Sequence, residues 1–287
     1  MWPLLASVVS IKFDKPTSRS FMKLLQHWQE YVIEAAGLGV FMVSAGVFAT
    51  ILYSPASTIA QNLANQALLQ GLLMGVAMGV TAIGIIYSPW GKRSGAHINP
   101  AVTITFFRLG KIEPWDTFCY IIAQFIGGLA GVLLVAILPW FSLHFTNPEN
   151  VNYAVTIPGS YGWLVAMIAE FIISFGLMTM VLFTSNNEKL APYTGIFAGF
   201  LVATYITFEA PISGMSMNPA RTFASSLPAD TWNWFWIYYF APPLAMLSAA
   251  EMYLRIGNQK RQDICCKLCP NSETPCISEE CCTKCRL

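Results

Sequence analysis

The chain has 287 residues, of which 55% are hydrophobic and only 11% are charged, whereas about 25% of residues are charged in a soluble globular protein. Its mean hydropathy of +0.53 points the same way. Water cannot solvate such a surface over most of its area, so the composition excludes an ordinary soluble protein and indicates an all-α membrane protein. The formal net charge of +1 gives no sign of nucleic-acid binding.

Apolar segments long enough to span a membrane occur along most of the chain. A spanning helix needs about 20 predominantly apolar residues, and we expect six such helices. They are predicted at 28–52, 66–88, 114–138, 162–184, 192–208 and 232–254.

The basic residues are distributed unequally between the two sides that these six helices define. Both termini, the region 89–113 and the loop 185–191 lie on one side, and they hold fifteen of the sixteen Lys and Arg residues. By the positive-inside rule, both termini of this multi-pass protein are predicted to be cytoplasmic. The sixteenth, Arg221, falls alone on the other side, and an isolated arginine in a membrane is normally functional.

The chain contains an internal repeat. The stretch "SGAHINPAVT" at 94–103 and the stretch "SGMSMNPART" at 213–222 share six of ten residues at a separation of 119. Glu34 and Glu170 also occupy the first helix of their respective halves. Because three spanning helices per half is an odd number, the halves must cross the membrane in opposite directions, as in channels and transporters with broken helices.

The repeated Asn-Pro pairs have the features of helix starts. Asparagine is favoured at the N-cap and proline in the first helical turn. Each motif therefore begins a half-helix, at 99–108 and 218–227, of about 15 Å. Two inverted half-helices meeting at Asn99 and Asn218 cover the hydrocarbon thickness of about 30 Å and direct their positive dipole ends at each other. The predicted result is a polar, re-entrant site at mid-membrane.

Such a site has a defined selectivity. The asparagine amides donate hydrogen bonds to a passing oxygen atom, and the paired helix dipoles repel cations and protons. Arg221 adds a fixed positive charge at the outer mouth. Acceptors for the passing molecule are expected from the backbone carbonyls of the unwound loops, which belong to Gly95, Ala96, His97, Gly214, Met215 and Ser216.

These motifs resemble those of the major intrinsic protein family, the aquaporins and glycerol facilitators. The resemblance covers about 28–255 and rests on the motif residues Asn99, Pro100, Ala101, Asn218, Pro219 and Ala220, with Arg221 after the second motif. It implies the aquaporin-like fold of six transmembrane helices plus two re-entrant half-helices. It also implies a homotetramer with one pore per subunit, passive flow of water or small neutral solutes, bracing of the loops by Glu34 and Glu170, and a place for Arg221 in the outer constriction.

The predicted constriction departs from the family's common pattern. Ile206 takes the fifth-helix position, where water channels usually carry histidine, and Met215 takes the neighbouring loop position. Met74 is the best placement for the second-helix position. Thr222 stands where typical glycerol facilitators have aspartate. This filter fits neither subtype, and its apolar character predicts water flow with some leak of small polar solutes.

A cysteine-rich tail follows the last helix and lies outside the resemblance. Four of its thiolates have a spacing that suits tetrahedral zinc, and this candidate ligand set is Cys266, Cys269, Cys282 and Cys285. Redox switching or lipidation of Cys265 and Cys266 is an alternative, and a tail without a role is another. The channel itself requires no cofactor.

We therefore divide the chain into a cytoplasmic N-terminal segment at 1–27, a channel domain at 28–255 with halves at about 28–138 and 162–255, and a cytoplasmic tail at 256–287. The leading hypothesis is a passive channel and not an enzyme. A proton-coupled secondary transporter that uses Glu34 or Glu170 is the alternative, and a membrane-bound thiol or metal protein is a third class that rests on the tail alone.

Overall fold

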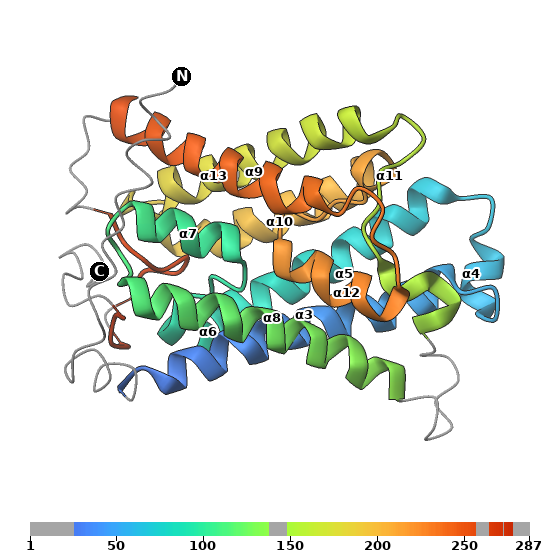
Figure 1. Cartoon of the computed structure of the whole chain (residues 1–287), viewed down its shortest axis with the longest axis horizontal. Helices are drawn as coiled ribbons and strands as arrows, with labels where there is room; N and C mark the ends of the chain where they lie inside the picture. The colour runs from blue at the N-terminus through green and yellow to red at the C-terminus, as the bar shows by residue number, and fades with distance from the viewer. Residues whose placement is uncertain (1–25, 138–147, 257–263, 272, 278–287) are drawn as a thin grey trace.

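The computed structural model describes residues 26–137, 148–256, 264–271 and 273–277. Within these ranges the protein is helical and has no strand, and its long helices run side by side along one axis (Figure 1). The predicted all-α fold class is confirmed.

In its described residues, the first half of the chain contains three long and three short helices. The long ones are α3 (Trp28–Tyr53), α5 (Ala67–Tyr87) and α8 (Pro114–Ile137). The short ones are α4 (Thr58–Asn62), α6 (Pro89–Ser94) and α7 (Pro100–Arg108).

The second half repeats this order after the 3-10 segment η3 (Pro148–Ala154). Its long helices are α9 (Trp163–Ser185), α10 (Thr194–Phe208) and α13 (Trp236–Ile256). The shorter elements are η4 (Ala191–Tyr193), α11 (Ala210–Ser213) and α12 (Pro219–Ala229).

Five of the six predicted spans reappear in the described residues as helices long and apolar enough to cross a membrane. The sixth, predicted at 232–254, begins later, at Trp236. Asp230 and Trp234 have φ angles of 45° and 58°, which a helix does not accommodate, so the chain turns before the helix starts. Glu251 and Arg255 near its end lower the apolar character of this helix.

The outer surface of the bundle is apolar. On α5, Leu72, Val76 and Val80 recur every four residues, and each is about half exposed, at 46%, 49% and 62%. Residues four apart lie on the same face of a helix, so these side chains form a stripe that points away from the protein. An exposed aliphatic stripe of this kind is suited to contact with lipid chains.

The two half-helices lie within the bundle and extend in opposite directions. In Figure 1, α7 extends toward the end of the bundle where α3 begins, and α12 extends toward the end that carries α4. Both begin at an Asn-Pro pair. The predicted re-entrant, inverted arrangement is therefore observed.

Glycines allow the long helices of the two halves to approach closely. Gly79 on α5 faces α10 so tightly that a Cβ atom there would lie 2.5 Å from the carbonyl oxygen of Gly199. Within the first half, a Cβ atom on Gly127 of α8 would lie 2.0 Å from the carbonyl oxygen of Ala35 on α3. Small residues at helix crossings are the usual device for close packing in membranes.

Gly79→Ala should weaken the contact between the halves. The added methyl group must displace backbone, so we expect the free energy of unfolding in detergent to fall by about 1–3 kcal/mol, measured by thermal or denaturant unfolding. Gly84→Ala on the same helix is the matched control, because a Cβ there meets nothing within 4 Å. Equal losses in both variants would contradict the packing role of Gly79.

Candidate functional site

A cavity of about 440 Å³ runs between the two halves. On α5 it is lined by Met74, Met78, Ala82 and Ile86, which are spaced four residues apart on one helical face. Since these residues extend over most of α5, the cavity follows the helix axis through the bundle. Residues of both unwound loops also line it.

The Asn-Pro pairs start their half-helices as the sequence predicts. The side-chain Oδ1 of Asn99 accepts a hydrogen bond from the backbone N–H of Ala101 at 2.9 Å. The Oδ1 of Asn218 accepts from the N–H groups of Ala220 and Arg221 at 3.0 and 3.2 Å. These are N-cap hydrogen bonds, which satisfy amide groups at the helix start.

The two asparagines also connect the halves to each other. The Nδ2 of Asn99 donates to the carbonyl oxygen of Met217, and the Nδ2 of Asn218 donates to that of Ile98, both at 2.8 Å. An asparagine amide has two N–H donors, so each retains a second donor. Because both residues line the cavity, that donor is available to a molecule inside it.

The unwound loops share an unusual backbone conformation. Ala96 and Ile98 in the first loop have φ angles of 53° and 40°, and Met215 and Met217 in the second have 49° and 54°. Left-handed conformations are uncommon for residues other than glycine and cost free energy unless the surroundings hold them. The same alternation in both loops shows that the repeat extends to backbone geometry.

Glu34 holds the first loop from α3. Its carboxylate is fully buried and accepts hydrogen bonds from Ser94 Oγ at 2.8 Å, His97 N at 3.0 Å and Ile98 N at 2.5 Å. Gln124 Nε2 on α8 adds a fourth at 2.8 Å. The backbone amides that the left-handed turns leave without a helical partner therefore find one here.

Glu170 holds the second loop from α9 in the same way. It accepts from Ser213 Oγ, Ser216 N and Met217 N at 2.8, 2.6 and 2.8 Å. Two tyrosines complete the pattern, since Tyr120 donates to the carbonyl of Ser94 and Tyr238 to that of Ser213. Single-sequence reasoning missed these tyrosines, which sit within apolar helices without a motif.

All four residues predicted for the constriction line the cavity. They come from four different elements of the protein and are Met74, Ile206, Met215 and Arg221. Among the described residues the Nη1 atom of Arg221 is buried and has no hydrogen-bond partner. A buried guanidinium donor without a partner is costly, so this atom is suited to bind a molecule in the cavity.

The predicted set of carbonyl acceptors needs one change. Five of its six residues line the cavity, and the exception is Gly95. The carbonyl oxygen of Gly95 accepts a hydrogen bond from the N–H of Leu268 at 3.1 Å, because the C-terminal tail lies over it. Ile98 and Met217 do line the cavity and were not predicted, although each directly precedes an Asn-Pro pair.

Sequence reasoning also missed two further segments of the cavity wall. Asn150, Val151, Ala154 and Val155 come from the connection between the halves, and Leu268 comes from the tail. Neither segment has a motif or a periodic pattern that points to a pore.

Half of the predicted zinc ligands, Cys282 and Cys285, lie outside the described residues. Among the residues that are described, no group of three or more His, Cys, Asp or Glu side chains is placed to hold a metal ion. Cys265 is disulfide-bonded, and both it and Cys266 are buried. Neither is exposed for lipidation in this conformation.

Glu170→Gln should destabilise the protein strongly. The amide nitrogen that replaces one carboxylate oxygen faces an N–H or O–H donor instead of accepting from it, so we expect the free energy of unfolding to fall by about 3 kcal/mol. Glu251→Gln is the control, because it removes an ion pair to Arg108 of 2.7 Å whose two side chains are each 25% exposed, and it should cost about 1 kcal/mol or less. Similar losses in detergent unfolding would argue against the bracing role.

Comparisons with known proteins agree with this geometry. The sequence model of the family described as "Major intrinsic protein" matches residues 21–253. The chain is 30% identical over 237 residues to aquaporin-8 of Mus musculus, which covers 82% of this chain and 85% of the relative. It is 31% identical over 174 residues to aquaporin NIP1-2 of Oryza sativa subsp. japonica, which covers 60% of this chain and 57% of that relative.

The fold has a counterpart among solved structures. The aquaglyceroporin of Plasmodium falciparum superposes with a TM-score of 0.64 at 20% identity, over 79% of this chain and 95% of the other. At this identity the likeness concerns the fold alone. The family match covers most of the chain and includes both Asn-Pro motifs. The chain therefore belongs to the major intrinsic protein family.

Proposed function

We propose that the protein is a passive transmembrane channel for water and small neutral solutes that excludes protons and ions. The observation that carries the proposal is the cavity into which both half-helices direct their N-terminal ends. A polar constriction between inverted half-helices is suited to a neutral, hydrogen-bonding molecule and unsuited to a cation.

Asn99 and Asn218 supply the hydrogen bonds at the centre of this pathway. One N–H of each amide is fixed on the opposite loop, which orients the second toward the passing molecule. A water molecule that accepts from both amides has its oxygen held between two positive dipole ends. Transfer of a proton through that water is disfavoured, because the positive charge would have to pass the same point.

The constriction at Arg221 selects among neutral molecules. Ile206, Met215 and Met74 make most of its wall apolar, and the Nη1 of Arg221 is the polar group. A wall of this kind does not supply the several polar partners that a strictly water-selective filter would need. We infer that water passes and that small polar solutes such as glycerol also leak through.

The domain division and the sidedness belong to this proposal. Residues 28–255 form the channel, 1–27 and 256–287 are cytoplasmic, and the protein crosses the membrane several times. Its partners are the bilayer, water and small neutral solutes, and the assembly is a homotetramer, as the family resemblance implies. The function is transport rather than enzymatic catalysis, and the channel requires no cofactor.

A proton-coupled transporter fits the geometry less well. Each oxygen of Glu34 accepts two hydrogen bonds, and three donors surround Glu170. Protonation of either carboxyl group would leave backbone amides without an acceptor. These residues are therefore suited to hold the loops and poorly suited to carry protons.

Osmotic flow in vesicles tests the proposal. Vesicles that contain the protein should swell or shrink faster than empty ones, with a linear dependence on the gradient and none on pH or ions, measured by light scattering. Water and glycerol should be compared side by side, since the filter predicts passage of both. Absence of acceleration for any small uncharged solute would refute the channel, and saturable, uphill, proton-dependent uptake would favour the transporter.

Arg221→Val tests the filter. Val102 occupies the matching place in the first half, so the shape has a precedent in the fold. We expect the variant to assemble, to pass water and larger solutes at least as readily, and to leak protons or small cations. Each 1.4 kcal/mol removed from the barrier raises a rate about tenfold, so we expect at least about a tenfold increase in cation leak.

Lys189→Val is the control for this variant, because Lys189 is an exposed basic residue in the loop after α9. Its ion exclusion should equal that of the unchanged protein. If Arg221→Val assembles with unchanged ion exclusion and solute selectivity, the filter is not Arg221, and the Asn-Pro breaks alone supply the selectivity.

A further inference from the structure

The C-terminal tail lies across one end of the cavity and is bonded to both halves of the channel. The N–H of Cys265 donates to Asn186 Oδ1, just after α9, at 2.8 Å. The carbonyl of Cys266 is hydrogen-bonded to His97 Nε2 at 2.9 Å, and the N–H of Leu268 donates to the carbonyl of Gly95. The tail therefore bridges the cavity mouth.

The side chain of Leu268 forms part of the cavity wall. It is 7% exposed and lines the same space as Ile86, His97 and the two asparagines. An aliphatic side chain offers no hydrogen bond, so a water molecule that leaves the loop carbonyls at this end finds no replacement partner next to it. A leucine in the mouth of a narrow pore obstructs flow both by its volume and by this lack of partners.

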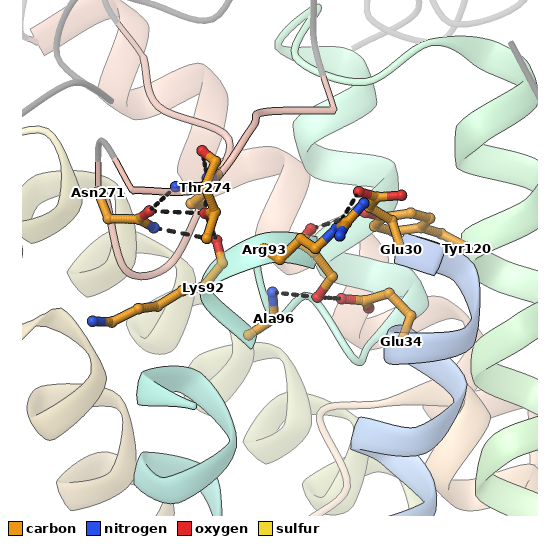
Figure 2. A network of polar contacts seen from close by, with 10 residues as sticks. Glu30, Glu34, Lys92, Arg93, Ala96, Tyr120, Asn271 and Thr274 are labelled. Atoms are coloured by element: carbon orange, nitrogen blue, oxygen red, sulfur yellow. Dashed lines mark hydrogen bonds and ion pairs between the residues drawn. The ribbon is translucent and has the colours of Figure 1, made fainter. Parts of the chain in front are cut away.

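A second contact anchors the tail on α6. Asn271 Nδ2 and Thr274 Oγ1 both donate to the carbonyl oxygen of Lys92, at 3.2 and 2.9 Å, and Figure 2 shows the two side chains over this turn. Lys92 lies in the last turn of α6, where carbonyl groups have no helical partner. The tail supplies the missing donors.

The helix that receives the tail is itself firmly held. Arg93 Nε pairs with Glu30 Oε1, and Ser94 Oγ donates to Glu34, each at 2.8 Å. Both contacts are drawn in Figure 2 beside the tail. Helix α6, on which the tail docks, is therefore hydrogen-bonded to Glu34, the residue whose carboxylate also braces the first loop.

The tail has a compact internal structure of its own. Lys267 is 1% exposed, and its Nζ donates to the carbonyl and the Oγ1 of Thr274 at 3.0 and 2.8 Å. Cys266 Sγ lies 2.7 Å from Cys276 Sγ. Burying an ammonium group is costly unless it is hydrogen-bonded, so the tail adopts a specific fold around Lys267.

We propose that residues 264–277 are an autoinhibitory plug that closes one mouth of the pore with the side chain of Leu268 and opens it when the segment detaches. The inference rests on the proposed channel function and adds a closed state to it. By the proposed sidedness the plug acts from the cytoplasm. The segment is held by hydrogen bonds, by an ion pair between Lys92 and the exposed Glu273 and by burial of apolar side chains such as Ile264 and Leu268. Because it is not part of a spanning helix, it can leave without unfolding the channel.

The test compares the water permeability of vesicles that carry equal amounts of one of four proteins, three of full length and one shortened, at one fixed redox condition. These are the unchanged protein, Leu268→Ala, a deletion of 264–287, and Leu268→Met as the matched control of nearly equal volume. A plug seated in about nine of ten channels limits flow to about a tenth. We therefore expect an increase approaching tenfold in the deletion, a clear increase in Leu268→Ala, and none in Leu268→Met.

A second measurement follows the plug directly in the full chain. The Cys269 thiol is buried, and burial raises its pKa, so it should react slowly with a water-soluble maleimide. Leu268→Asp places a charge in the apolar mouth, which should release the segment and speed labelling of Cys269 about tenfold, resolved by peptide mass spectrometry. Glu273→Gln serves as the control, because it removes only an ion pair of 3.8 Å between an exposed carboxylate and Lys92, which contributes little to binding, and it should leave the rate nearly unchanged.

The outcomes separate this inference from the function on which it rests. Equal and fast water flow in all four proteins, together with equal labelling of Cys269, overturns the plug and leaves the channel intact. No flow above that of empty vesicles in any protein, the deletion included, overturns the channel and the plug with it. Slow flow in the unchanged chain with fast flow in the deletion supports both.

Discussion

Two stretches of unwound backbone, 95–98 and 214–217, lie at the centre of the bundle, and their amide groups must be hydrogen-bonded without help from lipid. The buried carboxylates of Glu34 and Glu170 meet this requirement by accepting from the turns directly. The residues whose amides are held also line the cavity, and the carbonyls of Ile98 and Met217 among them accept from the opposite asparagine. The polar lining of the pore is thus a consequence of how its backbone donors are satisfied.

The two halves hydrogen-bond their unwound loops with the same residue types. They differ at the position of Arg221, where the pathway is asymmetric. Ser94 and Ser213 hold equivalent places, as do Tyr120 and Tyr238. By contrast, Val102 corresponds to Arg221. Both residues line the same cavity, so this difference places a positive charge on the wall at one half-helix and an apolar side chain at the other. The repeat therefore builds the pathway, and we propose that the departure at Arg221, one of four in the ten-residue motif, supplies the selectivity.

The sequence alone predicts those features that depend on local backbone chemistry. Asparagine followed by proline dictates a helix start wherever it occurs, so Asn99 and Asn218 could be placed, and their spacing implied the inverted halves. The spanning helices were predictable because each is a continuous apolar segment of sufficient length. The exception is the start of α13, where positive φ angles shortened the helix. Leu268 and Val151 could not be found, because a coil residue joins the cavity wall only through contacts with distant elements, and nothing local distinguishes it.

Each pore loop is also covered from outside by a segment of the chain, and the two covers differ in kind. The second loop lies under the connection between the halves, where Thr156 Oγ1 is 2.9 Å from the Oγ1 of Thr222. That segment is continuous with structure on both sides, since η3 precedes it and α9 follows. The first loop lies under the tail, which contacts it through the hydrogen bonds at Gly95 and His97. Four donors hold Glu34 without any contribution from the tail, so the first loop keeps its conformation when the tail departs. Detachment breaks the hydrogen bonds at Gly95, His97, Lys92 and Asn186, each worth about 1 kcal/mol net. It also exposes Ile264 and Leu268, which are buried with the core of the channel, so both contributions set the balance between the seated and the released tail.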